Sequence, residues 1–296
     1  MKRIIILFSL ITLICSSIFA QETAQKTIDL IITDKENNFV SDIKKEELTL
    51  YVDGKAQTDF SIEMQTSPLL YVLAVDNSGS MRVIFGDLID GGKVIISQNS
   101  KNDLTLLMRF ISRDKIQVTE KFSSDTKYLH ANLDNFFIEG GQTALVDAIY
   151  KSAQILAEQD GVGADYRRSI VVISDGEDRE SEKTEAQLLE LLKKEKVQVF
   201  FIGLINELSD SKGFGGKSQR EKAKQFIEKI TESNGGVALF PKKAEQISET
   251  AKQMSTLLRN RYVLKFKMPD NKAAKIEIKS SENSKRKNLN LYFSTN

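Results

Sequence analysis

The feature that most constrains the fold is an alternation of apolar, strand-length runs with helical patterns across the middle of the chain. The apolar runs are continuous, which is typical of strands buried on both faces of a parallel sheet. They read LLYVLAVD, LTLLMRFIS, SIVVISDG, VQVFFIGL and VALFP, at residues 69–76, 104–112, 169–176, 197–204 and 237–241. The alternation predicts an α/β fold with a doubly wound, mostly parallel sheet.

The segments between these runs carry apolar residues three and four positions apart, as amphipathic helices do. Helical patterns cover residues 143–159, 184–196, 220–233 and 244–260. Residues 114–124 (DKIQVTEKFSS) follow the second run after a connection too short for a crossover helix. They are therefore expected to form an antiparallel strand beside it.

The two flanks of the α/β region have a different pattern. Residues 27–64 alternate short apolar runs with turn signals such as Asp53-Gly54, and strand patterns return after residue 259. Each set of strands is too small to be stable alone, which predicts that the two sets pack into one small β module. The expected order is an N-terminal β segment at 21–66, an α/β domain at 67–259 and a C-terminal β segment at 260–296.

The first twenty residues have the pattern of a secretory signal peptide, which we place at 1–20. A short basic start precedes the almost wholly apolar residues 4–19, and Ala20 offers a small residue for cleavage before Gln21. The chain is therefore expected to be exported to the periplasm, the cell surface or the medium, with no membrane span after cleavage. The alternatives are an uncleaved membrane anchor and lipid attachment at Cys15.

Composition argues against several classes of function. The 42 basic residues balance 41 acidic ones, so no nucleic-acid partner is indicated. The single cysteine lies in the apolar leader, which leaves the mature chain without thiol chemistry. The single histidine, His130, lies in a polar helical stretch, and no G-x-S-x-G elbow, P-loop or G-x-G-x-x-G motif occurs.

Oxygen-bearing side chains follow the apolar runs, at the points where strands are expected to end. The stretch DNSGS places Asp76, Ser78 and Ser80 on one tight loop; Thr143 follows paired glycines before a helical pattern, and Asp175 ends another run. Because the carboxyl ends of parallel strands lie at one edge of a sheet, these three loops are expected to meet. Two carboxylates and three hydroxyls suit a hard cation such as Mg²⁺, with Mn²⁺ or Ca²⁺ as alternatives.

Each of these elements has a simpler interpretation when it is taken alone. The stretch DNSG is often only a turn, Thr143 alone is typical of a helix N-cap, and Asp175-Gly176 is typical of a strand-ending turn. The next acidic residues, Glu177 and Asp178, suggest either a second metal site or acids that complement the dipole of the following helix.

Taken together, DNSGS, the isolated Thr143 after paired glycines and VVISDGE resemble the metal-ion-dependent adhesion site (MIDAS) of von Willebrand factor type A (VWA) domains. The match is in residue type, order and strand context. The resemblance implies a doubly wound sheet with one antiparallel edge strand, and an intact MIDAS that holds Mg²⁺ or a similar cation at the five positions above. The flanking β segments look similar to those of a bacterial family of exported VWA-related proteins.

These patterns predict a metal-dependent, adhesion-type protein-binding module rather than an enzyme. A cation balanced by only two carboxylates stays electrophilic, so a partner's Asp or Glu carboxylate can replace one of its waters. The alternatives are an envelope scaffold or assembly protein whose metal is structural or absent, and a metal-dependent hydrolase, for which the sequence offers no base. The glycine-rich, basic residues 208–222 are expected to be either a mobile surface loop or a border of the metal face.

Overall fold

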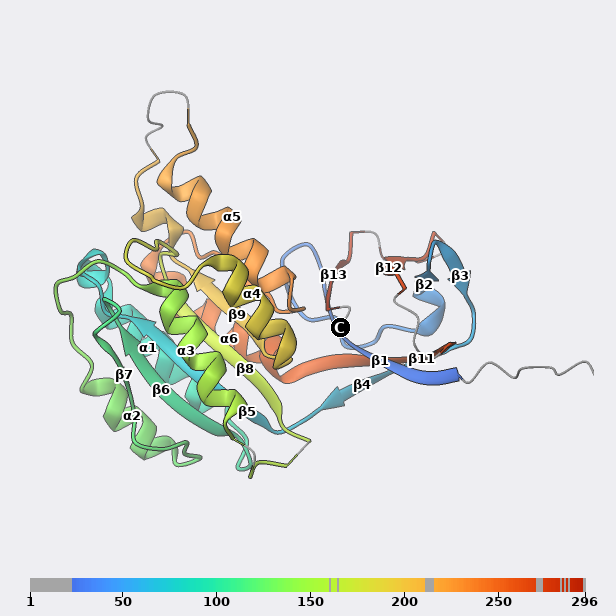
Figure 1. Cartoon of the computed structure of the whole chain (residues 1–296), viewed down its shortest axis with the longest axis horizontal. Helices are drawn as coiled ribbons and strands as arrows, with labels where there is room; N and C mark the ends of the chain where they lie inside the picture. The colour runs from blue at the N-terminus through green and yellow to red at the C-terminus, as the bar shows by residue number, and fades with distance from the viewer. Residues whose placement is uncertain are drawn as a thin grey trace, which may run out of the picture.

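The computed structural model describes residues 23–159, 161–163, 165–210, 216–269, 274–282, 284, 286 and 288–294. The expected signal peptide lies outside the described residues, as does Cys15. The described chain forms an α/β domain with a β module beside it (Figure 1).

The α/β domain is built on a six-stranded sheet with the order β10-β9-β8-β5-β6-β7. Five strands run parallel to one another: β5 (Leu69–Asp76), β6 (Leu104–Phe110), β8 (Arg167–Ser174), β9 (Gln198–Gly203) and β10 (Ala238–Leu239). The edge strand β7 (Ile116–Val118) pairs antiparallel with β6. The predicted fold class and its antiparallel edge strand are therefore confirmed.

Helices cover both faces of this sheet. Every residue of the central strand β5 is buried, although successive side chains of a strand point to opposite faces, so both faces must be covered. Tyr71 and Leu73 belong to one apolar cluster, and Val72 and Ala74 to the other. The first cluster includes residues of α1 (Phe85–Ser97), α2 (Thr126–Asp134) and α6 (Ile247–Arg259). The second includes residues of α3 (Leu145–Ala157), α4 (Glu185–Lys194) and α5 (Gln219–Glu232).

Short 3-10 turns complete the described helical structure: η1 (Lys45–Glu47), η2 (Gly79–Val83), η3 (Ile205–Glu207) and η4 (Ala244–Gln246). Among the described residues, no helix is long and apolar enough to cross a membrane.

The β module combines the two ends of the described chain, as the sequence predicts. It contains a four-stranded sheet with the order β13-β1-β11-β4 and a three-stranded sheet with the order β12-β2-β3. Its strands are β1 (Thr23–Thr33), β2 (Leu48–Val52), β3 (Lys55–Gln57), β4 (Phe60–Thr66), β11 (Asn260–Pro269), β12 (Ile276–Ser280) and β13 (Asn290–Phe293). Leu30, Leu50 and Leu264 are fully buried in its apolar core.

The two parts of the molecule are joined by continuous chain and by polar contacts such as that of the Gln253 side-chain amide, on α6, with the Glu36 carbonyl oxygen at 2.8 Å. Helix α6 ends at Arg259 and β11 begins at the next residue, so the domain leads directly into the module. The Arg259 guanidinium donates to the buried carboxylate of Asp103 at 2.6 Å, and Asp103 also accepts from the Leu69 amide at 2.9 Å. These contacts fix the start of β5 and the end of α6 to each other.

Candidate metal site

The site begins at Asp76, the last residue of the buried strand β5. Its Oδ1 accepts a hydrogen bond from the Ser78 amide at 2.9 Å, which closes a tight turn directly after the strand. Its Oδ2 accepts from the Ser174 hydroxyl at 2.6 Å, from the end of the neighbouring strand β8. The Asp76 carboxylate is therefore fixed at the carboxyl edge of the sheet by two neutral donors.

The two serines of the first loop connect Asp76 to Asp175. The loop turns into η2, where Ser78 Oγ lies 3.0 Å from Ser80 Oγ, and Ser80 Oγ donates to Asp175 Oδ2 at 2.9 Å. The other oxygen of Asp175 accepts from the Glu177 amide at 2.9 Å. The structure thus brings four of the five predicted residues into one hydrogen-bonded group.

Thr143 lies buried in the loop before α3 and borders the loop that carries Asp175. Its carbonyl oxygen accepts from the amides of Arg179 at 2.8 Å and Glu180 at 3.2 Å. Within the described part of the chain, its hydroxyl has no hydrogen-bond partner. The interpretation of Thr143 as a helix N-cap is wrong, because α3 begins at Leu145 and Ala144 occupies the cap position.

The acidic residues that follow Asp175 have other partners. Asp178 Oδ1 accepts from the Val146 amide at 3.1 Å, at the first turn of α3, and Glu177 forms an ion pair with Arg179 at 2.5 Å. Asp178 therefore stabilises a helix N-terminus, as the dipole interpretation expects, but the helix is α3 rather than the following α4. These contacts do not support a second metal site at Glu177 and Asp178.

Two residues of this edge were missed at the sequence level. Ser174 supplies the short hydrogen bond to Asp76, and the only available signal was its position at the end of an apolar run. Asn77 is fully buried, and its side-chain amide donates to the Phe137 carbonyl oxygen at 2.8 Å. Asn77 thereby holds the loop after α2 against the first loop, a contact across 60 residues that has no local sequence signal.

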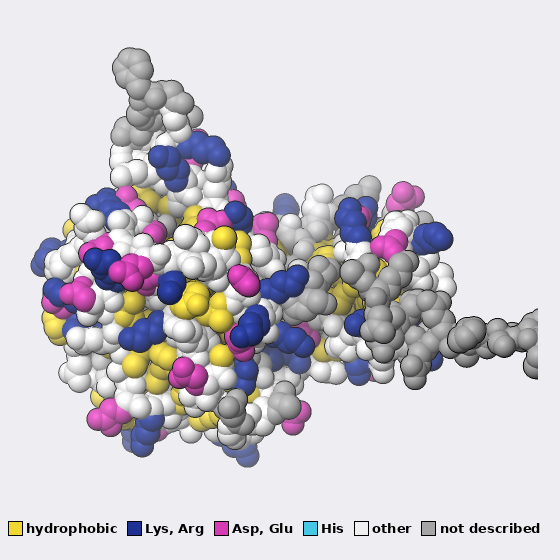
Figure 2. Space-filling view, viewed as in Figure 1, with side chains coloured by type: hydrophobic (Ala, Val, Ile, Leu, Met, Phe, Trp, Pro, Cys, Tyr) yellow, Lys and Arg dark blue, Asp and Glu magenta, His cyan; other side chains and the backbone are white. Residues whose placement is uncertain are grey.

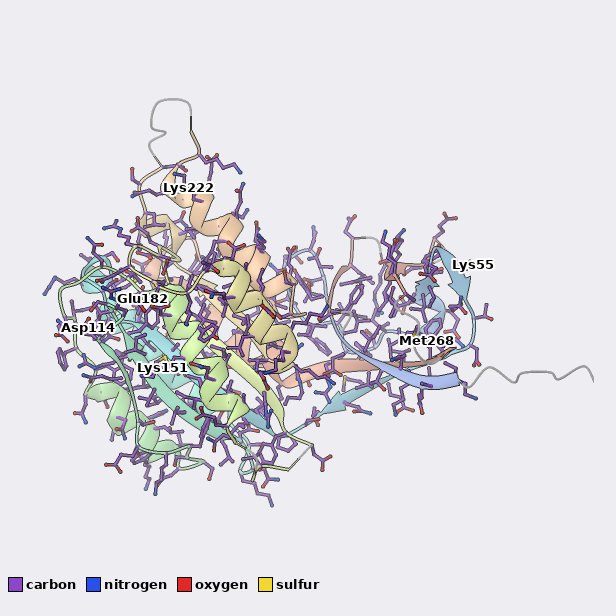
Figure 3. The ribbon with its side chains drawn as sticks, in the orientation of Figure 1. Lys55, Asp114, Lys151, Glu182, Lys222 and Met268 are labelled. Carbon is purple, nitrogen blue, oxygen red and sulfur yellow. The ribbon has the colours of Figure 1, made fainter. Side chains whose placement is uncertain are left out.

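The rim outside the site carries both charged and apolar side chains. Asp114, after β6, and Glu182, after β8, mark this end of the domain in Figure 3. Arg113 joins the two loops through an ion pair with Glu182 at 2.6 Å. Val83 and Phe137 are 91% and 53% exposed.

The segment 208–222 partly borders this face, although residues 211–215 lie outside the described residues. The Gln219 side-chain amide donates to Glu177 Oε1 at 3.1 Å, which places the start of α5 beside the loop of Asp175. Arg220 donates to the Leu208 carbonyl oxygen at 3.1 Å and so closes the base of the segment. Lys222, on α5 in Figure 3, ends it.

The site contains two carboxylates whose negative charge is not balanced by a positive side chain among the described residues. Both Asp76 and Asp175 have no exposed surface, and no described Lys or Arg forms an ion pair with either. Burial, together with the nearby charge of Asp175, raises the pKa of Asp76 to about 7. Burial also raises the pKa of Asp175. A bound cation would remove this penalty, because it supplies the positive charge that the described partners lack.

The donor set fits a hard divalent cation. Two carboxylates and two serine hydroxyls are gathered on a rigid edge, and the Thr143 hydroxyl is available on the adjoining loop. No group of three or more His, Cys, Asp or Glu suited to a metal occurs within the described ranges. The side chains gathered at this edge offer oxygen donors, which hard cations prefer.

Residues 71–177, which include all five site residues, match the family model of the von Willebrand factor type A domain. Three solved structures share the fold: a von Willebrand factor type A protein from Catenulispora acidiphila (14% identity, TM-score 0.51), the pilus adhesin SpaC from Lactobacillus rhamnosus GG (14%, 0.52), and proximal thread matrix protein 1 from the mussel byssus, with a zinc-occupied MIDAS motif (15%, 0.51).

These structural matches concern the fold alone, because the identities are low. They cover 78%, 78% and 68% of this chain, but the chain spans only 50%, 35% and 49% of the three proteins. No curated protein matches the chain. The family match over residues 71–177 and the sheet topology agree on a VWA-like α/β fold for this part of the chain.

Proposed function

We propose that this VWA domain is an exported, metal-dependent protein-binding module. A divalent cation, Mg²⁺ or in its place Mn²⁺ or Ca²⁺, is held at the carboxyl edge of the sheet, and the loaded site captures an acidic side chain of a protein partner. The proposed ligands, direct or through water, are Asp76, Ser78, Ser80, Thr143 and Asp175.

One observation carries the proposal: two fully buried carboxylates are connected through serine hydroxyls and surrounded by neutral donors. Burying a carboxylate without a compensating charge is costly, and two adjacent ones repel each other as well. Such an arrangement is stabilised when a bound ligand supplies positive charge that offsets this electrostatic cost. A divalent cation does so, and it remains electrophilic enough to accept a further oxygen from outside.

The Thr143 hydroxyl is suited to a role in partner binding. It is neutral and lacks a partner among the described residues, whereas each carboxylate already receives two hydrogen bonds. Asp76 and Asp175 therefore supply the charge that holds the cation. Thr143, which adds no charge, contributes chiefly when an acidic ligand occupies the remaining position.

The exposed apolar side chains nearby suit a protein partner. Val83 ends η2, which follows the first loop, and the carbonyl of Phe137 is bound by Asn77 in that loop. The Arg109 guanidinium lies over the Phe137 ring, 4.1 Å from its centre, in a cation–π contact. A partner that presents a carboxylate beside an apolar surface would cover the metal site and the exposed apolar side chains together. Protein interfaces with a buried anchor residue are built in this way.

Affinity capture from envelope extracts of a producing cell, with the mature chain as bait, tests this function. A partner should bind in Mg²⁺, be released by EDTA and fail to bind the Asp76→Ala variant. The control is Asp114→Asn, which removes an exposed carboxylate of the same rim and should capture the partner normally. Capture that survives EDTA would instead favour a scaffold or assembly protein with a structural or absent metal.

A further inference from the structure

A second polar site lies at the opposite end of the sheet, where the domain meets the β module. A cavity of about 1010 Å³ opens there, lined by the start of β8, the chain between β4 and β5, and parts of β1 and β11. Lys and Arg side chains are visible beside this junction in Figure 2. The cavity is separate from the metal edge, since Arg167 begins β8 and Asp175 follows its end, roughly 25 Å away.

Arg167 is one of two arginines that line this cavity. Its side chain is only 7% exposed. Its Nη1 donates to the Leu258 carbonyl oxygen at 2.9 Å and its Nη2 to Gln198 Oε1 at 2.5 Å. Its Nε is buried and has no acceptor. Among the described residues, Arg167 therefore has two neutral acceptors, an unused donor and no carboxylate in contact.

Arg261, on β11, is the second arginine. Its Nη2 donates to the Ser67 hydroxyl at 3.2 Å, and its Nε lies 3.3 Å from Asp29 Oδ1 without forming a hydrogen bond. Its Nη1 is buried with no acceptor. Arg167 lies beside it, because the Arg167 amide donates to the Pro68 carbonyl oxygen at 3.0 Å, one residue after Ser67.

The charges around the two arginines do not balance. Asp29 is the one carboxylate in contact with the pair among the described residues. Burial, and then the neighbouring charge of Arg261, lower the pKa of Arg167 to about 10. Lys26, Arg168 and Lys196 add three further basic residues to the lining, against Asp165 and Glu195. The cavity thus has an excess of positive charge and buried N–H groups that need acceptors.

We propose that this cavity is an oxyanion site, in which a phosphate, sulfate or carboxylate group binds between Arg167 and Arg261. Guanidinium groups present planar sets of N–H donors that match the oxygens of such anions. An oxyanion supplies the missing acceptors and the missing negative charge together. It also contacts both parts of the molecule, because Arg167 belongs to the domain and Arg261 to the module.

Calorimetric titration of the mature chain with inorganic phosphate tests this site, in EDTA and at constant ionic strength set with chloride. We expect saturable binding that is weakened about tenfold by Arg261→Gln. The matched control is Arg113→Gln, whose guanidinium pairs with Glu182 on the exposed rim and which should bind phosphate normally. Parallel titrations with sulfate, acetate and methyl phosphate show which oxyanion class the cavity prefers.

A second variant separates binding from a merely structural role of the arginines. Asp29→Asn removes the carboxylate that lies against Arg261, so it should tighten phosphate binding several-fold. If the two arginines only join the domain to the module, phosphate affinity should be the same in both variants as in the parent. The proposal is overturned if phosphate behaves like chloride, or if Asp29→Asn fails to bind phosphate more tightly than the parent. The Asp29→Asn titration remains a valid test even if Arg261→Gln does not fold.

Discussion

The two ends of the central sheet hold buried charges of opposite sign, and they are built in different ways. At the carboxyl edge, Asp76 ends strand β5 and Asp175 directly follows strand β8, and neutral donors hold both. At the other end, Arg167 and Arg261 come from separate parts of the molecule, and Asp29, which contacts Arg261, is the one carboxylate in contact with either among the described residues. The first site follows from strand topology, whereas the second exists only because the β module docks on the domain.

The difference matters for the proposed functions because each end is proposed to bind a different kind of ligand. The carboxylate pair favours a small cation of high charge density, and the guanidinium pair favours a larger oxyanion. Changes at one end should therefore leave ligand binding at the other end intact.

The largest effect is expected for Asp76→Ala. The change removes one of the two carboxylates, so Mg²⁺ affinity should fall by about 100-fold or more, since a charged ligand contact is worth several kcal/mol. The apo fold should remain intact, because the repulsion between the two carboxylates is lost at the same time. Calorimetric titration with Mg²⁺ measures the affinity, and circular dichroism checks the fold. A parent-like affinity would exclude Asp76 as a principal ligand.

The next effect concerns pH. The pKa of Asp76 is raised from 3.8 to about 7 in the folded apo protein, so the folded state holds a proton that the unfolded state releases near pH 4. The free energy of unfolding should therefore fall as pH rises from about 4 to 7, by on the order of a few kcal/mol. Mg²⁺ affinity should rise over the same range, because the cation competes with that proton.

Chemical denaturation of the apo protein between pH 4 and 8 measures this dependence. Asp76→Asn should flatten it and should stabilise the apo protein above pH 7, because the amide carries no charge to bury. An equal slope in the variant and the parent would show that other groups cause the pH dependence.

A smaller effect on the metal is expected for Thr143→Ala. Because Thr143 adds no charge, Mg²⁺ affinity should fall only about threefold, while metal-dependent partner binding should fall about tenfold. Titration with Mg²⁺ and the EDTA-sensitive capture assay together measure the two effects. Ser181→Ala is a suitable control, since the Ser181 hydroxyl accepts from the Asp147 amide and donates to Asp178 Oδ1 but lies outside the proposed ligand set. Equal losses in both assays would contradict a special role for Thr143 in partner binding.

The smallest expected effect is the coupling between the two ends. Saturating sulfate should change Mg²⁺ affinity by less than about twofold, because the two sites share no residues and lie at opposite ends of β8. Titration with Mg²⁺ at constant ionic strength, with and without sulfate, measures the coupling. A larger change would show that the docking of the β module is linked to the metal edge.

Much of the fold was predictable because its signals are local. The strands of the sheet are continuous apolar runs, and the antiparallel β7 follows from a connection too short to cross over. Helix α1 was missed because Gly91 and Gly92 weaken its helical pattern. The structure explains these glycines, since a Cβ at Gly91 would lie 2.6 Å from Ile247 Cγ2 of α6. Gly91 therefore permits close packing of α1 against α6, and Gly92 lies against Leu133 of α2, where a Cβ would be 3.1 Å from Cδ1.

Part of the candidate site was also predictable from local sequence signals. Asp76, Ser78, Ser80 and Asp175 are brought together by strand ends, which the apolar pattern locates. The capping of α3 by Asp178 and the anchoring of the Phe137 loop by Asn77 were not predictable, because both partners come from distant loops. Arg167 and Arg261 carry no motif, since their proximity depends on how the module docks.

The most direct test of the central claim is the position of a bound metal in crystals of the mature protein grown with Mn²⁺. An anomalous difference map recorded at the manganese edge locates the ion without any assumption about its ligands. We expect one strong peak within coordination distance of the Asp76 loop, with Ser78 and Ser80 oxygens among its neighbours. A fully occupied peak at Glu177 and Asp178, or no peak at the carboxyl edge at saturating Mn²⁺, would contradict the proposed site.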